Sequence, residues 1–397
     1  MSTNNDEQFD FPYCDDVDEK YDKISHIGKG TFGEVWRAKN KATKYEVALK
    51  KILMDNEQEG FPITALREIK LLSTYKHENI VNLIEVCRSK QDINGKAISY
   101  LVFDFCHHDL AGLIQEAKEL FNNIEIIKCI LKQLLEGLHL LHSRKVIHRD
   151  MKSSNILITK DGVLKIADFG LARTFEYKHE RKYTNRVVTL WYRPPELLLG
   201  ERDYDCAVDI WGVGCILCEL FIKDPIMKGG TEQKQLELIV NEIGPINTEI
   251  WPRVGDLPQY EKMSNFLNKQ QKRYSILRKL RPHTNDPNAH DLIRKMFTLD
   301  PSKRISVAGA LDHDFFWDEV KPVASREALA KLLLPIGTSK FEYTARNNRQ
   351  RQNPPANPHL AQQMVNRNNH HHHHRNIHHN HRPGTSNNDG QYRDHVY

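Results

Sequence analysis

The sequence lacks the features that carry a chain into or across a membrane. No run of about 18 or more apolar residues occurs in its 397 residues, so we expect no membrane-spanning helix and no membrane partner. The first 21 residues contain acidic side chains but no apolar run, unlike a secretory signal. The seven cysteines are scattered, which fits a reducing compartment such as the cytosol or the nucleus.

One cysteine pair, Cys215 and Cys218, has the CxxC spacing of metal and redox sites. A zinc site needs a second pair of ligands, and the sequence shows none. The pair lies in the apolar run Trp211–Phe221, which predicts a buried helix. Core packing is therefore the favoured interpretation, ahead of metal or redox chemistry.

Excess positive charge is absent from the first 345 residues. Residues 346–397 hold seven Arg and two Asp but no Lys or Glu, which accounts for the whole net charge of +5. A neutral body argues against a globular nucleic-acid-binding face. Direct nucleic-acid binding is therefore not expected, apart from weak polyanion contacts through the tail.

Apolar residues nearly vanish after Tyr343. Segment 344–397 is rich in Asn, His and Arg and cannot bury enough apolar surface to offset its chain entropy, so we predict a disordered tail. The run His370–His374 resembles an affinity tag, but it is internal and surrounded by further Asn and His. A native low-complexity segment is favoured, either as a solvated spacer or as an RNA-binding module.

The apolar pattern predicts an α+β fold of two unlike lobes. We expect an acidic flexible extension at 1–20, a small β-rich lobe at 21–105 and a larger α-helical lobe from 106 onward. The crevice between two such lobes is a natural ligand site.

Particular segments carry these expectations. In the small lobe, Val47–Lys50 and Ser99–Asp104 are the clearest strands, and Ile63–Leu72 has helical spacing. In the larger lobe, Ile124–His142 repeats apolar residues at the period of a long buried helix.

A glycine-rich segment, Gly28–Val35, has the pattern GxGxxGxV. A lone GxGxxG is weak evidence, because dinucleotide-binding folds use it to open a helix, but the residues that follow here favour a strand. Lys50 ends the next strand, and a glycine hairpin beside such a lysine can hold phosphates. The alternative for Lys50, a solvated surface lysine, is disfavoured by its apolar neighbours.

The segment His148–Asn155 and the later Asp168 supply groups that suit phosphoryl transfer. Asp150 can accept or orient the proton of a substrate hydroxyl, and Lys152 can lie beside the transferring phosphate. Asn155 and Asp168 can bind Mg²⁺. Phosphoryl transfer needs this positioning and charge neutralisation more than it needs covalent catalysis.

These motifs, with Pro194–Glu196, occur in the order and spacing of the protein-kinase signature set, so residues 21–317 resemble eukaryotic protein kinases. The resemblance implies a bilobal protein-kinase fold, ATP and Mg²⁺ as cofactors, Phe103 as gatekeeper and a buried pair between Glu196 and Arg304. It also implies that the α-helical lobe, 106–317, ends at residue 317 and has an extension at 318–343. The residues implied to contact ATP are Ile27, Gly28, Lys29, Gly30, Thr31, Phe32, Gly33, Glu34, Val35, Ala48, Lys50, Asp104, Cys106, Asp109 near the ribose, and Leu157.

Residues 61–68 are similar to the cyclin-contacting helix of cyclin-dependent kinases. This resemblance implies a cyclin partner and a catalytic ion pair between Glu68 and Lys50. Exposed side chains at Ile63 or Leu66 would mark that partner surface, and plain lobe packing is the alternative.

Residues 183–193 resemble the activation segment of the same family. The resemblance implies that Thr184 is the activating phosphosite. It also implies that Arg67, Arg149 and Arg173 hold the phosphate through charge-assisted bonds.

The same segment bears on the substrate. Val187 and Val188 would wall an apolar pocket that makes no demand for a backbone N–H, which fits Ser/Thr-Pro sites. Phe32 stands where cell-cycle members carry an inhibitory tyrosine, so that control is absent.

Within the family, the resemblance is to members that act on RNA polymerase II. It implies a T-type cyclin, a nuclear location and promotion of transcription elongation, with the C-terminal polymerase repeats and negative elongation factors as substrates. The broken basic segment Lys269–Arg281 gives weak support for a nuclear signal.

Two rival interpretations remain open. One is another transcriptional or cell-cycle member of the family, which the copurifying cyclin would identify. The other is a catalytically dead scaffold, but dead kinases usually lose a residue equivalent to Lys50, Asp150 or Asp168, and all three are present.

Overall fold

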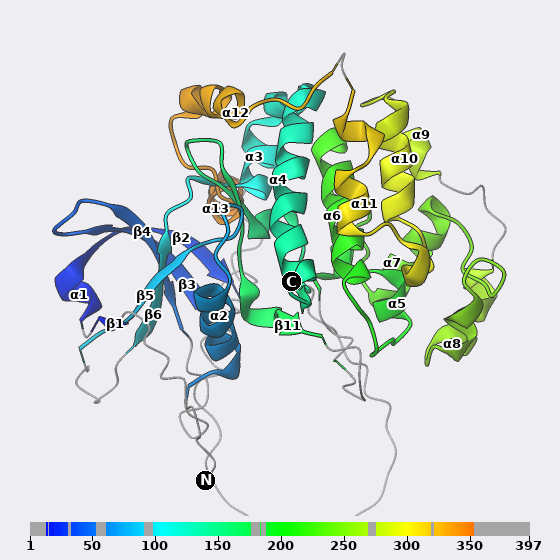
Figure 1. Ribbon diagram of the computed structural model, residues 1–397, viewed down its shortest axis with the longest axis horizontal. Coiled ribbons are helices and arrows are strands. Elements are labelled where there is room, and N and C mark those ends of the chain that lie inside the picture. Colours follow the sequence, from blue (N-terminus) through cyan, green and yellow to red (C-terminus); the bar gives the residue numbers. More distant parts are fainter. Residues whose placement is uncertain are drawn as a thin grey trace, which may run out of the picture.

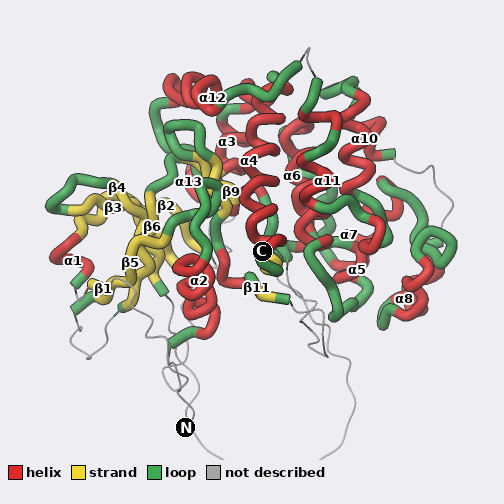
Figure 2. Tube along the Cα trace, viewed as in Figure 1, coloured by secondary structure: helices red, strands yellow, loops and turns green. Residues whose placement is uncertain are grey.

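The computed structural model describes residues 13–14, 16–30, 33–52, 61–90, 98–175, 183, 188–268, 275–318 and 321–352. These residues form two lobes (Figure 1). Strands gather in the lobe on the left and helices fill the lobe on the right (Figure 2). This arrangement confirms the predicted α+β fold with a small β-rich lobe followed by a larger helical lobe.

The small lobe is built on a six-stranded sheet with the order β1-β5-β6-β4-β3-β2. Strand β1 pairs with β5 in parallel, and the other neighbouring strands pair antiparallel. The strands are β1 (Tyr13–Cys14), β2 (Tyr21–Gly30), β3 (Gly33–Asn40), β4 (Glu46–Lys51), β5 (Leu83–Arg88) and β6 (Ser99–Asp104).

Helix α2 (Ile63–Thr74) begins after Pro62, a residue that is tolerated at the start of a helix. It buries Ala65, Glu68, Leu71 and Leu72. The predicted helix at 63–72 and the two predicted strands are confirmed: Ser99–Asp104 has the predicted bounds, β4 is one residue longer at each end, and α2 is two residues longer at its C-terminal end.

The predicted flexible extension at 1–20 is partly wrong. Strand β1 joins the sheet, and α1 (Val17–Lys20) follows it. Asp16 caps α1 by accepting a bond from the Asp18 N–H at 2.8 Å, and the Val17 side chain is fully buried in the core of the small lobe. The acidic composition suggested exposure, but the buried Val17, the cap and the ion pair of Lys20 with Glu85 at 2.7 Å dock the segment on the sheet.

The large lobe is mainly helical. Its helices up to residue 311 are α3 (Leu110–Glu116), α4 (Ile124–Ser143), α5 (Pro195–Leu198), α6 (Ala207–Ile222), α7 (Glu232–Glu242), α8 (Tyr260–Leu267), α9 (Ile276–Leu280), α10 (Pro287–Met296) and α11 (Val307–Leu311). Its short strands are β7 (His108–Asp109), β8 (Val146–Ile147), β9 (Ile156–Ile158), β10 (Leu164–Ile166) and β11 (Arg173–Thr174).

Helix α6 lies at the centre of this lobe, where every residue from Val208 to Phe221 is buried. Helix α4 runs beside it (Figure 1) and matches the predicted helix at 124–142. Cys215 and Cys218 lie inside α6 with exposed fractions of 2% and 0%, so the core-packing interpretation of this pair is confirmed. None of the described helices is both long and apolar enough to cross a bilayer.

The C-terminal residues continue past the large lobe. Helix α12 (Arg326–Leu333) packs on α4, and α13 (Glu342–Gln352) packs on α3 and reaches β2. The predicted disordered tail at 344–397 is therefore wrong for its first nine residues, which belong to α13. The remainder, residues 353–397, lies outside the described residues.

A buried ion pair joins distant parts of the large lobe. The Glu196 carboxylate accepts bonds from Arg304 Nη1 at 2.7 Å and Nη2 at 2.9 Å, and both side chains are at most 1% exposed. This pair was predicted from the sequence and is confirmed. It joins the Pro194–Glu196 motif to a turn that lies 108 residues later in the sequence.

We expect Arg304→Ala to lower the free energy of unfolding by about 3–5 kcal/mol, because it leaves the Glu196 charge buried and unpaired. Chemical denaturation measures this loss. Lys228→Ala is the control, since both partners of its ion pair with Asp224 are exposed and the pair should contribute less than about 1 kcal/mol. Equal losses in both variants would contradict the assignment.

Candidate active site

The facing surfaces of the two lobes bring together the residues predicted to hold the nucleotide. Ile27, Val35 and Ala48 lie on β2, β3 and β4 of the small lobe, and Leu157 lies on β9 of the large lobe. All four are half-buried, and Ala48 pairs in register with the buried Phe103. Their predicted packing against a base stays a prediction.

The glycine segment forms the β2–β3 hairpin, in which Gly30 pairs with Gly33 and Gly28 with Val35. Gly33 has φ 135°, a conformation that favours glycine. Thr31 and Phe32 at its tip lie outside the described residues, so their predicted roles stay predictions. The nucleotide contacts predicted for Lys29, Glu34, Asp104 and Cys106 also stay predictions.

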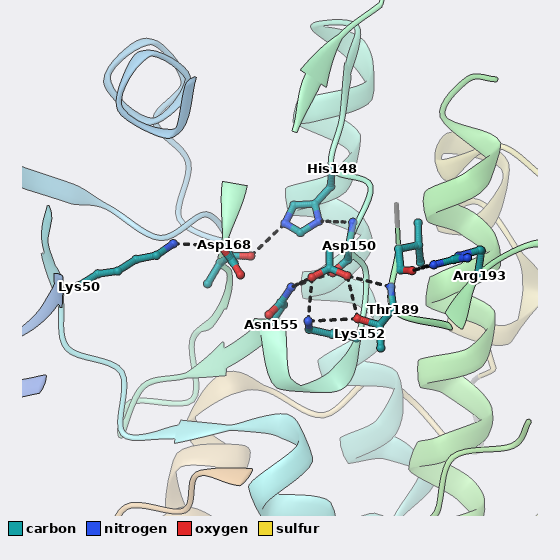
Figure 3. A network of polar contacts seen from close by, with 10 residues as sticks. Lys50, His148, Asp150, Lys152, Asn155, Asp168, Thr189 and Arg193 are labelled. Atoms are coloured by element: carbon teal, nitrogen blue, oxygen red, sulfur yellow. Dashed lines mark hydrogen bonds and ion pairs between the residues drawn. The ribbon is translucent and has the colours of Figure 1, made fainter. Parts of the chain in front are cut away.

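Lys50 lies at the junction of the lobes and joins three elements. Its Nζ contacts Glu68 Oε2 on α2 at 2.9 Å and Asp168 Oδ1 of the large lobe at 2.9 Å. The predicted Lys50–Glu68 pair is therefore present, with α2 docked inward. Figure 3 shows Lys50 reaching toward Asp168.

The charges of this cluster stabilise one another. Burial alone would lower the pKa of Lys50, but the carboxylates of Asp168 and Glu68 raise it above its ordinary value. Burial raises the pKa of Glu68, which Lys50 opposes. For Asp168, burial is outweighed by Lys50 and Lys152, so its pKa is lowered and the side chain is an anion at neutral pH.

The catalytic loop, residues 148–155, is held at its start by Asp209, a buried residue of α6. Its carboxylate accepts the backbone N–H groups of His148 at 2.9 Å and Arg149 at 2.8 Å, and contacts His142 Nε2 at 2.9 Å. Arg149 is held at φ 67°, a strained conformation for a non-glycine residue. Sequence reasoning missed Asp209, although an acidic residue in an apolar helix signals a buried polar partner.

Asp150 accepts four side-chain or backbone bonds at the centre of the site (Figure 3). Its Oδ1 accepts from the Thr189 hydroxyl at 3.0 Å and the Thr189 N–H at 3.2 Å. Its Oδ2 accepts from Asn155 Nδ2 at 3.0 Å and lies 2.8 Å from Lys152 Nζ. The predicted catalytic residues Asp150, Lys152 and Asn155 are thus brought together, while Thr189 was missed.

Asp168 and Asn155 fit a magnesium ion carried by a nucleotide. Asp168, at φ 66°, supplies an anionic oxygen, and Asn155 donates its amide N–H to Asp150, which leaves its carbonyl oxygen as a ligand. The described residues contain no group of three or more His, Cys, Asp or Glu side chains able to hold a metal alone. Mg²⁺ commonly takes one or two carboxylates together with substrate phosphates, so the donor set suits it.

A short turn follows at Val188–Arg193. Val188 has φ 66°, and its carbonyl accepts from Arg193 Nη2 at 3.0 Å and Nε at 3.2 Å (Figure 3). A β-branched residue in this conformation is strained, so the turn needs outside contacts to hold it. Arg193 was another residue that sequence reasoning missed.

The electrostatics of Arg67 involve the other two predicted phosphate-binding arginines. Burial lowers the pKa of Arg67, and the positive charges of Arg173 and Arg149 lower it further. Arg149 also donates from Nη1 to the Tyr204 hydroxyl at 2.9 Å. Thr184, the predicted phosphosite, and Val187 lie outside the described residues.

Asp109 has partners other than those predicted. Its Oδ1 accepts from the Gly112 N–H at 2.6 Å and its Oδ2 from the Glu342 N–H at 2.9 Å, so the carboxylate caps α3 and the start of α13. Burial raises its pKa to about 8. The structure therefore engages both oxygens within the protein, and the ribose contact stays a prediction.

Comparison with known proteins agrees with this geometry. Residues 21–316 match the family model described as protein kinase domain, so the chain belongs to the protein kinases. Within them it is similar to the cyclin-dependent kinases. It is 53% identical to cyclin-dependent kinase 9 of Homo sapiens over 339 residues, which is 84% of this chain and 89% of that protein. It is 52% identical to cyclin-dependent kinase 9 of Danio rerio over 358 residues, or 88% and 93%.

A solved structure shows the same fold. The crystal structure of the yeast RNA polymerase II CTD kinase CTDK-1 complex aligns with a TM-score of 0.67 and 40% identity, covering 76% of this chain and 94% of that chain. These findings confirm the resemblance to cyclin-dependent kinases and the bilobal kinase fold. Protein kinases in general use ATP and Mg²⁺.

We expect Asp168→Asn to reduce phosphoryl transfer by at least about 10²–10³-fold, because it removes the anionic metal ligand and a partner of Lys50. Transfer of the γ-phosphate by the purified cyclin complex measures the effect. Asp161→Asn, in the exposed turn between β9 and β10, makes the same chemical change away from the site and should keep full activity. Robust turnover by Asp168→Asn would overturn the metal role.

Proposed function

We propose that this protein is a cyclin-activated serine/threonine kinase that transfers the ATP γ-phosphate to Ser/Thr-Pro sites, above all in the C-terminal repeats of RNA polymerase II. The observation that carries the proposal is the Lys50 cluster, in which one lysine joins Glu68 of α2 to Asp168. Asp150 and Lys152 lie beside it in position to orient a hydroxyl. Similarity to cyclin-dependent kinase 9 and to the yeast RNA polymerase II CTD kinase supports the polymerase substrate. The proposed role in transcription elongation in the nucleus follows the sequence resemblance.

The geometry of the Val188 turn supports proline after the phosphoacceptor. The Val188 carbonyl oxygen already accepts two hydrogen bonds from Arg193, so it is not available to accept one from a substrate backbone N–H. An ordinary residue would bury an unsatisfied N–H there, whereas proline has none. Ser/Thr-Pro sequences are therefore favoured, because any other residue after the phosphoacceptor would bury an unpaired N–H.

Helix α2 presents an apolar surface for the proposed cyclin. Ile63 is 58% exposed and Leu66 is 47% exposed, on the helix that carries Glu68. A partner that covers these side chains would hold α2 inward and keep Glu68 on Lys50. The names of the cyclin-dependent kinase relatives support a cyclin partner, and the T-type cyclin implied by the sequence resemblance is the proposed one.

We expect Leu66→Glu to weaken cyclin binding at least about tenfold, since it places a charge in the apolar contact. Copurification and titration of a T-type cyclin measure the change. Leu334→Glu is the control, because Leu334 is 72% exposed in the large lobe, away from α2. If both variants bind cyclin as the wild type does, α2 is not the partner surface. If another cyclin copurifies with the wild type, the T-type assignment fails.

Thr184 is the proposed activating phosphosite, with Arg67, Arg149 and Arg173 as its phosphate-binding group. We expect Thr184→Ala to lower kcat/KM by about tenfold or more and to weaken the response to cyclin, because one phosphate could link α2, the catalytic loop and the segment after Asp168. Phosphorylation of a polymerase-repeat peptide by the purified complex measures it. Unchanged activity would contradict the three-arginine site.

A further inference from the structure

The turn Val188–Arg193, which the proposed function links to proline preference, is contacted by the start of helix α7. Arg193 Nη1 contacts Glu232 Oε1 at 2.5 Å, while its Nε and Nη2 hold the Val188 carbonyl. Arg193 is 13% exposed, so one guanidinium links a surface carboxylate to a backbone oxygen in the turn. Glu232 is the first residue of α7, with Thr231 as its N-cap.

A second set of bonds fixes the same helix end against the turn. Buried Gln235 donates to the Trp191 carbonyl at 3.2 Å and accepts from the Gly229 N–H at 2.8 Å. The Trp191 indole N–H donates to the Gly229 carbonyl at 3.1 Å. A side chain at Gly229 would lie 2.6 Å from the Gln235 backbone, so Gly229 packs directly against the start of α7. These contacts join the end of α7 that carries Glu232 to the turn that carries Arg193.

We propose that Glu232 is a positioning residue for substrate specificity: by orienting Arg193 it keeps the Val188 carbonyl away from the residue after the phosphoacceptor. This inference rests on the proposed Ser/Thr-Pro specificity. Val188 at φ 66° would relax toward negative φ if its carbonyl were released, because the left-handed region is unfavourable for a β-branched residue. The relaxed carbonyl could then accept an N–H from a residue other than proline.

The test is Glu232→Gln in the full-length cyclin complex. We expect the ratio of kcat/KM for a Ser-Pro peptide to that for the matched Ser-Ala peptide to fall about tenfold, mainly because the Ser-Ala peptide is used better. Glu237→Gln removes the same charge from the same helix, where Glu237 contacts Lys234 and Gln233 on the surface, and should leave the ratio unchanged. A purely structural defect would lower both rates together and keep the ratio.

A double-mutant cycle keeps the proposal falsifiable. In an Arg193→Lys background, Glu232→Gln should have little further effect on the ratio, since the two residues act in series. An unchanged ratio in Glu232→Gln, with wild-type melting temperature and clear proline preference in the wild type, would overturn the role of Glu232. Absence of proline preference in the wild type would instead overturn the proposed specificity.

Discussion

The contact of Lys50 with both Glu68 and Asp168 is the constraint on which the rest of the structure depends. Three charges from β4, α2 and the large lobe meet within 3 Å of one nitrogen, and burial makes each of them costly alone. The position of α2 is thereby coupled to the residue that would hold metal. Any partner that moves α2 therefore changes the electrostatics of phosphate binding without touching the nucleotide.

Much of this site was predictable because its residues lie at fixed spacings in the sequence. Lys50, Asp150, Asn155 and Asp168 each follow a recognisable local motif, and the structure brings them to one place. The pair of Glu196 with Arg304 was also predictable, since both belong to such motifs. By contrast, the roles of Asp209 and Arg193 depend on backbone atoms that only the folded chain brings near.

The ends of the folded region were the least predictable part. Residues 16–20 and 344–352 have polar compositions that predict flexibility, yet both are helical and docked. Few apolar contacts are needed when the receiving surface already exists, as for Val17 in the core of the small lobe. The docking of α13 on Asp109 was also not predictable from local sequence, because Asp109 and its partner Glu342 are 233 residues apart.

Arg149, Asp168 and Val188 all have positive φ although none is glycine. Such a conformation costs about 1–2 kcal/mol per residue, so glycine at these positions would relieve strain while removing a functional side chain. The chain thus gives up part of its limited stability to keep charge and shape where the reaction needs them. Selection for thermal robustness alone would therefore drift toward inactive variants, and a screen for hardier forms of this enzyme has to monitor turnover at the same time.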